Sequence, residues 1–270
     1  MEGGPLPLTL ETVPTTPREL RSLIRQGEWR GTTAGLAPNH VQANLVVLPR
    51  AQAFDFLLFC QRNPRPCPLL EVLEPGMAEP SIAPGADIRT DIPRYRIYRD
   101  GVLDREAEEI TDVWQDDLVT FLLGCSFTFE TALMAAGIRL RHVDEGSNVS
   151  MYVTNIATVR AGMFSGPLVV SMRPIPQTRV VKAVQVTSRF PNAHGAPVHI
   201  GKPEAIGVED LGKTDYGDAT AVLEDEVPVF WACGVTPQAV AAASKPPLMI
   251  THAPGHMFIT DLRDEDLAVV

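Results

Sequence analysis

The sequence predicts an α/β protein, and three observations carry that prediction. Short apolar runs typical of buried strands alternate along the chain with segments of helical spacing. The 270 residues are enough for one large domain or two modest ones with a substantial core. Residue usage changes near position 146. We therefore predict a main α/β domain over residues 1–146 and 191–270 and a smaller inserted α+β domain over residues 147–190.

Helices in the first half are signalled by capping residues and by apolar spacing. Thr16, Pro17 and Glu19 form a helix start, and Gly27 ends that helix. A second helix is predicted from residue 49 to about residue 62, where Phe and Leu side chains share one face.

Strands and turns separate these helices from the next ones. Residues 69–73 predict a buried strand, and residues 94–99 alternate Tyr and Ile with Arg before the hairpin turn Asp100-Gly101. Residues 45–48 are continuously apolar, and periodicity does not decide between a strand and a turn of helix. Residues 117–123 and 128–136 are helical in pattern and are joined by a turn that starts at Gly124.

The second half returns to strands. Residues 148–176 are rich in Val, Thr, Met and Tyr with Gly and Pro breaks, which indicates two or three strands. Residues 178–189 predict a helix. Residues 227–232 and 248–251 predict buried strands, with an Ala-rich helix over residues 236–244 between them.

Composition excludes several classes of protein. The chain holds 23 Lys and Arg against 33 Asp and Glu, a net charge of −10, which disfavours binding to a nucleic-acid backbone. Its apolar runs are too short to span a bilayer, and its N-terminus lacks the basic start and apolar core of a secretion signal. We expect a cytoplasmic protein with no membrane or nucleic-acid partner. Its oligomeric state stays open, a homo-oligomer included.

The four cysteines predict buried thiols. Cys60 and Cys67 are separated by six residues, and Cys125 and Cys233 stand alone. No Cys-x-x-Cys occurs, so neither a zinc ribbon nor a thioredoxin-like motif is indicated.

Histidines gather in two Gly- and Pro-rich segments. The first holds His194 and His199 and is followed by Asp218, and the second holds His252 and His256. His and Asp on irregular backbone beside strand ends are typical of α/β active sites. Metal binding is an open alternative because imidazole and carboxylate suit zinc or manganese. However, Pro-Gly between His252 and His256 breaks the helix that would place both on one face, so we expect no metal and no cofactor.

The turn before residue 130 predicts an anion-binding helix start. Gly124, Cys125, Ser126 and Thr128 offer backbone N–H groups and hydroxyl caps for a carboxylate or phosphate. Cys125 is a candidate nucleophile at that helix start, although a buried thiol is the simpler interpretation. Glu130 is interpreted as a capping residue.

Arginines are the second candidate for holding a carboxylate. Arg94, Arg96, Arg141 and Arg173 lie in turn-like or strand-like sequence, and a guanidinium binds a carboxylate through two hydrogen bonds. We favour Arg173 because it ends an apolar strand.

Six segments together resemble the bacterial hydro-lyase family and the N-terminal part of mitochondrial D-glutamate cyclase. They are Gly124-Cys-Ser-Phe-Thr-Phe-Glu130, Asn148-Val-Ser-Met-Tyr-Val-Thr-Asn155, Val169-Val-Ser-Met-Arg-Pro174, His194-Gly-Ala-Pro-Val-His-Ile-Gly201, Val229-Phe-Trp-Ala-Cys-Gly-Val-Thr-Pro-Gln238 and Ile250-Thr-His-Ala-Pro-Gly-His256. The resemblance covers nearly the whole chain. It implies a carbon–oxygen lyase and a Rossmann-like three-layer sandwich with a smaller two-layer α+β part. The additional C-terminal domain of the mitochondrial enzyme is not part of this chain.

These features predict a hydro-lyase that acts on a small carboxylated metabolite, D-glutamate/5-oxoproline chemistry included. Eliminating water requires a base, an acid and a carboxylate clamp. We predict His194 or His199 as base, His252 as acid and Asp218 as the group that orients one of them. Arg173 and the turn formed by Gly124, Cys125, Ser126 and Thr128 are predicted to hold the carboxylate.

Two alternatives and one geometric expectation remain. The alternatives are a metal-assisted hydrolase or hydratase, with His194, His199, His252 and Asp218 as ligands, and a metabolite-binding protein without turnover. If residues 227–232 and 248–251 are neighbouring strands, both histidine segments should meet at one sheet edge, facing the helix start across a cleft.

Overall fold

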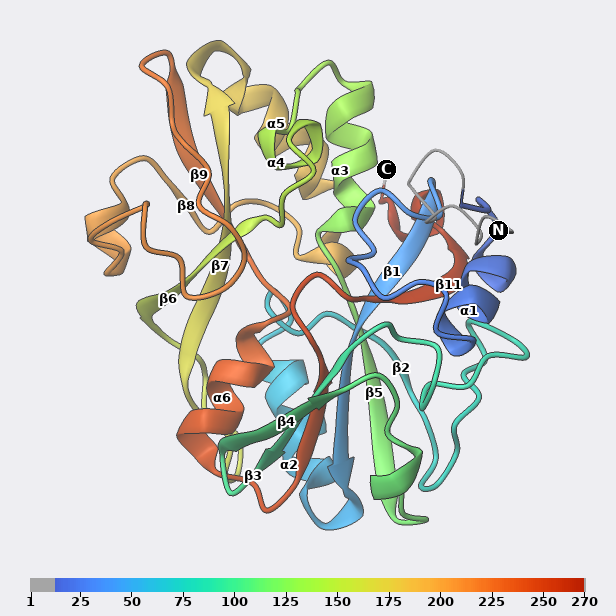
Figure 1. Cartoon of the computed structure of the whole chain (residues 1–270). Coiled ribbons are helices and arrows are strands. Elements are labelled where there is room, and N and C mark those ends of the chain that lie inside the picture. The colour runs from blue at the N-terminus through green and yellow to red at the C-terminus, as the bar shows by residue number, and fades with distance from the viewer. Residues whose placement is uncertain (1–12, 270) are drawn as a thin grey trace, which may run out of the picture.

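The structure is a computed structural model that describes residues 13–269, and it contains two antiparallel sheets (Figure 1). The N-terminal residues from which we predict the lack of a secretion signal lie outside this range. The first sheet has the order β2-β5-β1-β10-β3-β4, and β11 also pairs with β1. Its strands are β1 (His40–Pro49), β2 (Leu69–Val72), β3 (Tyr95–Arg99), β4 (Val102–Ala107), β5 (Leu118–Gly124), β10 (Met249–His252) and β11 (Phe258–Arg263). The second sheet has the order β6-β7-β9-β8 and comprises β6 (Ser150–Ala157), β7 (Pro167–Pro176), β8 (His199–Ile200) and β9 (Glu226–Ala232).

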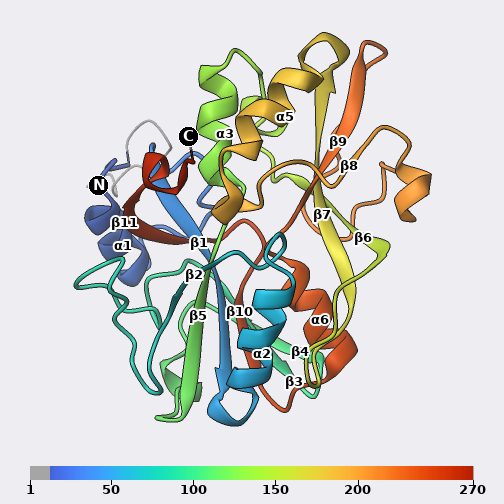
Figure 2. The ribbon, with the colours of Figure 1, turned by 180° about the vertical axis from the view of Figure 1, so that it is seen from behind.

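Helices cover one face of each sheet. They are α1 (Pro17–Arg25), α2 (Arg50–Arg62), α3 (Phe127–Ala135), α4 (Arg141–Asp144), α5 (Val180–Ser188) and α6 (Thr236–Ser244). Side chains of α2 and α6 share a buried cluster with one face of β1 and β5, whereas α3 and α5 pack on β7 and β9 (Figure 2). The opposite face of the first sheet is covered by the segment between β2 and β3, which contributes Ala83, Ile88 and Ile92. The architecture is therefore mixed α/β.

The Rossmann-like three-layer expectation is not confirmed. Every strand pair in both sheets is antiparallel, whereas Rossmann folds are built on a parallel sheet between two helical layers. The second sheet also takes in β8 and β9, so it extends beyond residues 147–190.

One secondary-structure prediction is wrong. Residues 117–123, which we expected to be helical, form β5 between β1 and β2. Leu118 and Leu122 pack on one face of the sheet, and Phe121 and Leu123 pack on the other. A strand that is buried on both faces shows no polar alternation, so its sequence does not differ from that of a buried helix. The undecided run 45–48 belongs to β1.

The two late strands are also not neighbours. β9 pairs with β7 and β8 in the second sheet, whereas β10 pairs with β1 and β3 in the first. The expectation that they share one sheet edge is therefore wrong. The helix that follows β9 is nevertheless linked to the end of β10, because Gln238 in α6 hydrogen-bonds to the His252 carbonyl.

Candidate active site

Three backbone segments meet on β1 at what we call the sheet junction, formed by Asn44, Gly124, Asn192 and Gly234. Asn44 Nδ2 donates to the Gly124 carbonyl at 2.6 Å, which fixes the end of β5. A Cβ on Gly234 would lie 2.0 Å from Asn44 Nδ2, and a Cβ on Gly124 would lie 1.8 Å from the Asn192 carbonyl oxygen. Both positions require glycine because the Asn192 backbone fills the space beside Gly124 and the Asn44 side chain fills the space beside Gly234.

His252 lies at the end of β10, beside β1, and its ring is buried. The Leu45 N–H lies 3.1 Å from His252 Nδ1, closer than the Leu45 carbonyl at 3.5 Å, which assigns the ring proton to Nε2. That Nε2 has no hydrogen-bond partner among residues 13–269. Burial, with smaller effects of the His256 and Arg96 charges, lowers the pKa of His252 to about 3 against the opposing effect of the Leu45 backbone. At neutral pH, His252 is an uncharged hydrogen-bond donor.

His194 is buried as well, but it carries its proton on the other nitrogen. Its Nδ1 contacts the Arg65 carbonyl at 2.6 Å, and a carbonyl only accepts, so Nε2 carries a lone pair. Within the described part of the chain, Nε2 has no partner. Burial, with a smaller effect of the Arg173 charge, lowers the pKa of His194 to about 4 against the opposing effect of the Arg65 carbonyl. The residue has a φ of 77°, an uncommon conformation for a side-chain-bearing residue, which the adjacent packing must maintain.

Arg173 and Glu130 form a buried ion pair under α3. Arg173 lies on the face of β7 that packs against α3 and donates through Nε to Glu130 Oε1 at 3.0 Å and again through Nη2. The remaining contacts are from Nη2 to Ser126 Oγ at 2.9 Å and from Nη1 to Ser171 Oγ at 3.0 Å. Four of its five N–H groups are therefore occupied, which leaves one for a ligand.

Glu130 is fixed in its ionised form by its partners. His142 Nε2 contacts the same Oε1 at 3.1 Å. Burial alone would raise the pKa of Glu130, but Arg173 and then His142 outweigh it and hold that pKa at about 2. Glu130 is therefore more than a capping residue, and Ser126, which precedes α3, makes no capping bond.

Cys125 and Cys233 follow β5 and β9 and are buried. Burial raises the pKa of the Cys125 thiol to about 12 and that of Cys233 to about 11. Both are protonated at neutral pH, and a thiolate is the nucleophilic form. The structure gives Cys125 no activation as a nucleophile.

A polar cavity of about 370 Å³ opens beside His252. Its lining includes Arg94, Arg96, Asn148, Tyr216 and His256. Arg96 lies over the Tyr216 ring at 5.9 Å, and Tyr216 packs against the buried cluster that contains Cys233. This cavity therefore joins β3 and the loop after β10 to the second sheet.

Gln238 links this cavity to His252. Its Oε1 accepts from Arg96 Nη1 at 3.2 Å and from the Tyr98 hydroxyl at 3.1 Å, and its Nε2 donates to the His252 carbonyl at 2.9 Å. Nothing in the Ala-rich sequence of α6 marks this glutamine for such a role. Arg96, by contrast, was among the candidate arginines.

Two predicted site residues lie elsewhere. His199 in β8 pairs with Phe230 in β9, and the two rings lie 5.8 Å apart. The Phe230 ring packs on one face of the second sheet, and Arg173 and Trp231 lie on the other. The second sheet therefore separates His199 from the junction. Asp218 accepts from the Asn148 N–H at 2.8 Å, so it holds the chain before β6 and orients no histidine.

The remaining predicted residues divide around α3. Gly124, Cys125, Ser126 and Arg173 belong to the junction and its ion pair, whereas Thr128 lines a different cavity. Among the described residues, no three His, Cys, Asp or Glu side chains are placed to hold a metal ion. The metal alternative therefore has no ligand set there. Over the same residues, no helix has the length and apolarity to cross a membrane.

Comparison with known proteins is consistent with the resemblance. A family model described as D-glutamate cyclase matches residues 119–261. Relatives from Stutzerimonas stutzeri, Geobacillus kaustophilus and Bacillus subtilis are 64%, 63% and 62% identical over 94%, 95% and 94% of this chain. The alignments cover 97%, 98% and 99% of those proteins, each named a "Putative hydro-lyase".

A solved structure of a nitrogen repressor-like protein from Methanococcus jannaschii matches 91% of this chain and 98% of its own, with a TM-score of 0.39 and 10% identity. The family match spans more than half of the chain, and the relatives match almost all of it. The chain therefore belongs to the D-glutamate cyclase family of lyases.

Proposed function

We propose that the protein is a hydro-lyase that exchanges water with a small carboxylated metabolite at the sheet junction. D-glutamate, which would close to 5-oxo-D-proline, is the first substrate to test because the matching family model is described as D-glutamate cyclase. The observation that carries the mechanism is the pair of buried imidazoles, His194 and His252, whose unpartnered nitrogens have opposite proton occupancy.

Ring closure of glutamate needs what these two groups offer. The amine nitrogen forms a bond to the carbon of the side-chain carboxylate, and one oxygen of that carboxylate leaves as water. The two protons lost by the ammonium balance the two gained by the leaving oxygen. His194 Nε2 carries these two protons in turn from the nitrogen to the departing oxygen, and His252 Nε2–H donates a hydrogen bond to that oxygen and keeps its proton.

The depressed pKa values keep both imidazoles uncharged at neutral pH. A base with a pKa of about 4 is free at neutral pH, and a neutral imidazole N–H polarises a carboxyl oxygen without first being protonated. Both groups act in a buried setting, where hydrogen bonds to developing charge are stronger than in water.

The substrate carboxylate is held by Arg94 and Arg96 in this proposal. Both line the 370 Å³ cavity, and Gln238 accepts from Arg96. Glu106 also lines it and pairs with Arg94 at 3.6 Å and with Arg96 at 2.9 Å. The side chains of Arg94 and Arg96 are 42% and 22% exposed, whereas that of Arg173 is 1% exposed, so only the first two can be reached by a substrate. Arg173, the predicted clamp, is largely occupied by Glu130 and the two serines, so its role is to position the α3 start.

Turnover with matched variants tests the proposal. The purified protein is incubated with D-glutamate or L-glutamate, and 5-oxoproline is followed by chiral mass detection. In the reverse direction, 5-oxo-D-proline in oxygen-18-labelled water should place one heavy oxygen in the glutamate product. His194→Ala and His252→Ala should each slow turnover about a hundredfold or more, the usual contribution of a general acid or base.

The matched control is His199→Ala, which changes a histidine five residues from His194 on the other side of the second sheet. It should keep nearly full turnover. Full turnover in His194→Ala and His252→Ala would refute the assignment. Binding of glutamate without any product would instead support a metabolite-binding protein.

A further inference from the structure

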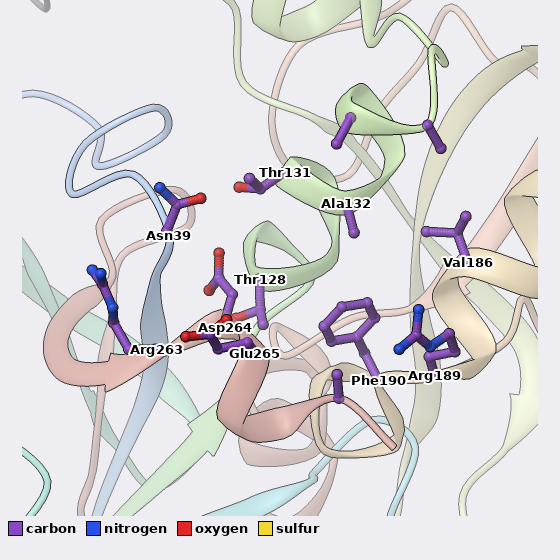
Figure 3. Close-up of a pocket in the computed structure, with 13 residues that line it drawn as sticks. Asn39, Thr128, Thr131, Ala132, Val186, Arg189, Phe190, Arg263, Asp264 and Glu265 are labelled. Atoms are coloured by element: carbon purple, nitrogen blue, oxygen red, sulfur yellow. The ribbon is translucent and has the colours of Figure 1, made fainter. Parts of the chain in front are cut away.

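A second cavity, of about 610 Å³, lies beside α3 (Figure 3). Its walls come from α3, the end of α5 and the segment after β11. None of its lining residues is shared with the 370 Å³ cavity that Arg94 and Arg96 line. The two cavities are therefore separate sites.

Two buried oxygens without partners face this second cavity. Asp264 Oδ1 and Thr128 Oγ1 make no hydrogen bond within residues 13–269, although the two residues are only 9% and 1% exposed. Buried polar atoms are nearly always paired, so each such atom marks capacity for a further partner. In Figure 3, both side chains point into the cavity from the side where Asn39 and Thr131 also lie.

The charge balance around Asp264 leaves it without a direct counter-ion. Its neighbour Arg263 directs Nη1 to His40 Nε2 at 3.0 Å. Burial raises the pKa of Asp264 to about 7, against the opposing effects of the Thr131 hydroxyl and the Arg263 charge. A cationic ligand group would supply the missing partner.

The opposite wall is mostly apolar. Its lining residues are Ala132, Ala135, Ala136, Val186 and Phe190, together with Arg189. Arg189 Nε donates to the Val269 carbonyl at 3.3 Å. A ligand that fills the cavity thus meets acceptor oxygens at one end and a mainly hydrocarbon wall at the other.

We propose that this cavity binds a small ligand with a primary ammonium head and a branched apolar body. The ammonium donates to Asp264 Oδ1 and Thr128 Oγ1, and the apolar body packs on the α3 alanines, Val186 and Phe190. The site is independent of the proposed reaction, whose substrate is held by its carboxylate at the junction.

Three probes of the same shape test the proposal on the full chain. Isoamylamine, isoamyl alcohol and isovalerate differ only in whether the head is cationic, neutral or anionic. Binding is measured by calorimetry, and the site is located from NMR shifts of the Ala132 methyl group, with His256 as the reference for the other cavity. Isoamylamine should bind at least about tenfold more tightly than either other probe, the ratio expected of a charged hydrogen bond.

Variants then assign the contact. Asp264→Asn keeps the shape and removes the charge, and it should weaken isoamylamine binding about tenfold or more. The control Glu265→Gln removes a neighbouring negative charge at the cavity wall and should change binding less than twofold. Ala132→Leu fills the apolar wall and should abolish binding of all three probes.

Three results would overturn the proposal. Equal affinity for isovalerate, unchanged isoamylamine binding in Asp264→Asn, or equal losses in Asp264→Asn and Glu265→Gln would each contradict it. If Asp264→Asn fails to fold, Thr128→Val with Ala132→Leu carries the same test.

Discussion

Glu130 and Asp264 are both buried carboxyls, yet their surroundings shift their pKa values in opposite directions. Glu130 has Arg173 and His142 as partners, and its pKa is lowered to about 2. Asp264 has an unpartnered oxygen among the described residues, and its pKa is raised to about 7. The difference teaches that partners, rather than burial, decide whether a buried carboxylate is a fixed structural charge or a group ready for a ligand.

The same contrast runs along the first turns of α3. The Ser126 hydroxyl is bound by Arg173 at 2.9 Å, whereas the Thr128 hydroxyl finds no partner in the part of the chain that the structure describes. One helix thus presents a satisfied polar network on one side and unused bonding capacity on the other.

The largest expected effect is the removal of Glu130. Glu130→Ala leaves Arg173 buried without its counter-ion and should lower the free energy of unfolding by about 3–5 kcal/mol. Urea denaturation at pH 7 measures this. Glu145→Ala, at an exposed glutamate after α4, should change stability by less than about 0.5 kcal/mol. Equal losses of stability in the two variants would contradict a stabilising role of the Glu130–Arg173 ion pair.

The Glu130 contribution should also depend on pH. Its folded-state pKa of about 2 is below the ordinary value of 4.5, so its stabilisation is present above pH 4.5 and is lost as pH falls through 2. The stability difference between the wild type and Glu130→Gln should therefore shrink by on the order of 3 kcal/mol between pH 5 and pH 2. A constant difference over that range would contradict the assignment of Glu130 as ionised.

Asp264 should behave in the opposite sense. Its folded-state pKa of about 7 lies above the ordinary value of 3.8, so its ionisation destabilises the fold increasingly as pH rises from 4 to 7. Asp264→Asn should therefore raise the free energy of unfolding by up to about 4 kcal/mol at pH 8, with the gain vanishing near pH 4. Thermal unfolding across this range decides, and destabilisation at pH 8 would show that Asp264 has a partner.

The two hydroxyls of α3 give the smallest effect. Ser126→Ala removes a hydrogen bond to a buried charge and should cost about 1–2 kcal/mol. Thr128→Val keeps the side-chain shape and removes an unpartnered hydroxyl, so stability should stay within about 0.5 kcal/mol of the wild type or rise. Matched denaturant titrations measure the stability of the two variants. Equal losses of stability would contradict the difference in hydrogen bonding between the Ser126 and Thr128 hydroxyls.

Local signals in the sequence predicted several elements correctly. α1 begins where Thr16 accepts a bond from the Glu19 N–H, and the Asp100-Gly101 turn joins β3 to β4 with positive φ at both residues. These features depend on a few adjacent residues. The assignment of residues 117–123 failed because their structure depends on β1 and β2, which are distant in the sequence.

The candidate site was predictable in its parts and not in its pairings. The motif segments identified His194, His252, Arg173 and the Gly124 turn, but the partner of His194 is a carbonyl 129 residues earlier in the chain. His199 lies only five positions beyond His194, yet its pairing in β8 places it on the opposite sheet face. Tertiary contacts determine these partners and sheet faces, and the neighbouring sequence does not indicate them.

The place of β1 has a consequence for how the chain folds during synthesis. Its partners β5, β10 and β11 are translated long after it, and the bond between Leu45 and His252 spans 207 positions. Until those strands emerge, β1 exposes apolar side chains on both faces. The fold is therefore rich in distant contacts, and we expect it to form slowly and only after β10 and β11 have emerged, with β1 prone to aggregation until then.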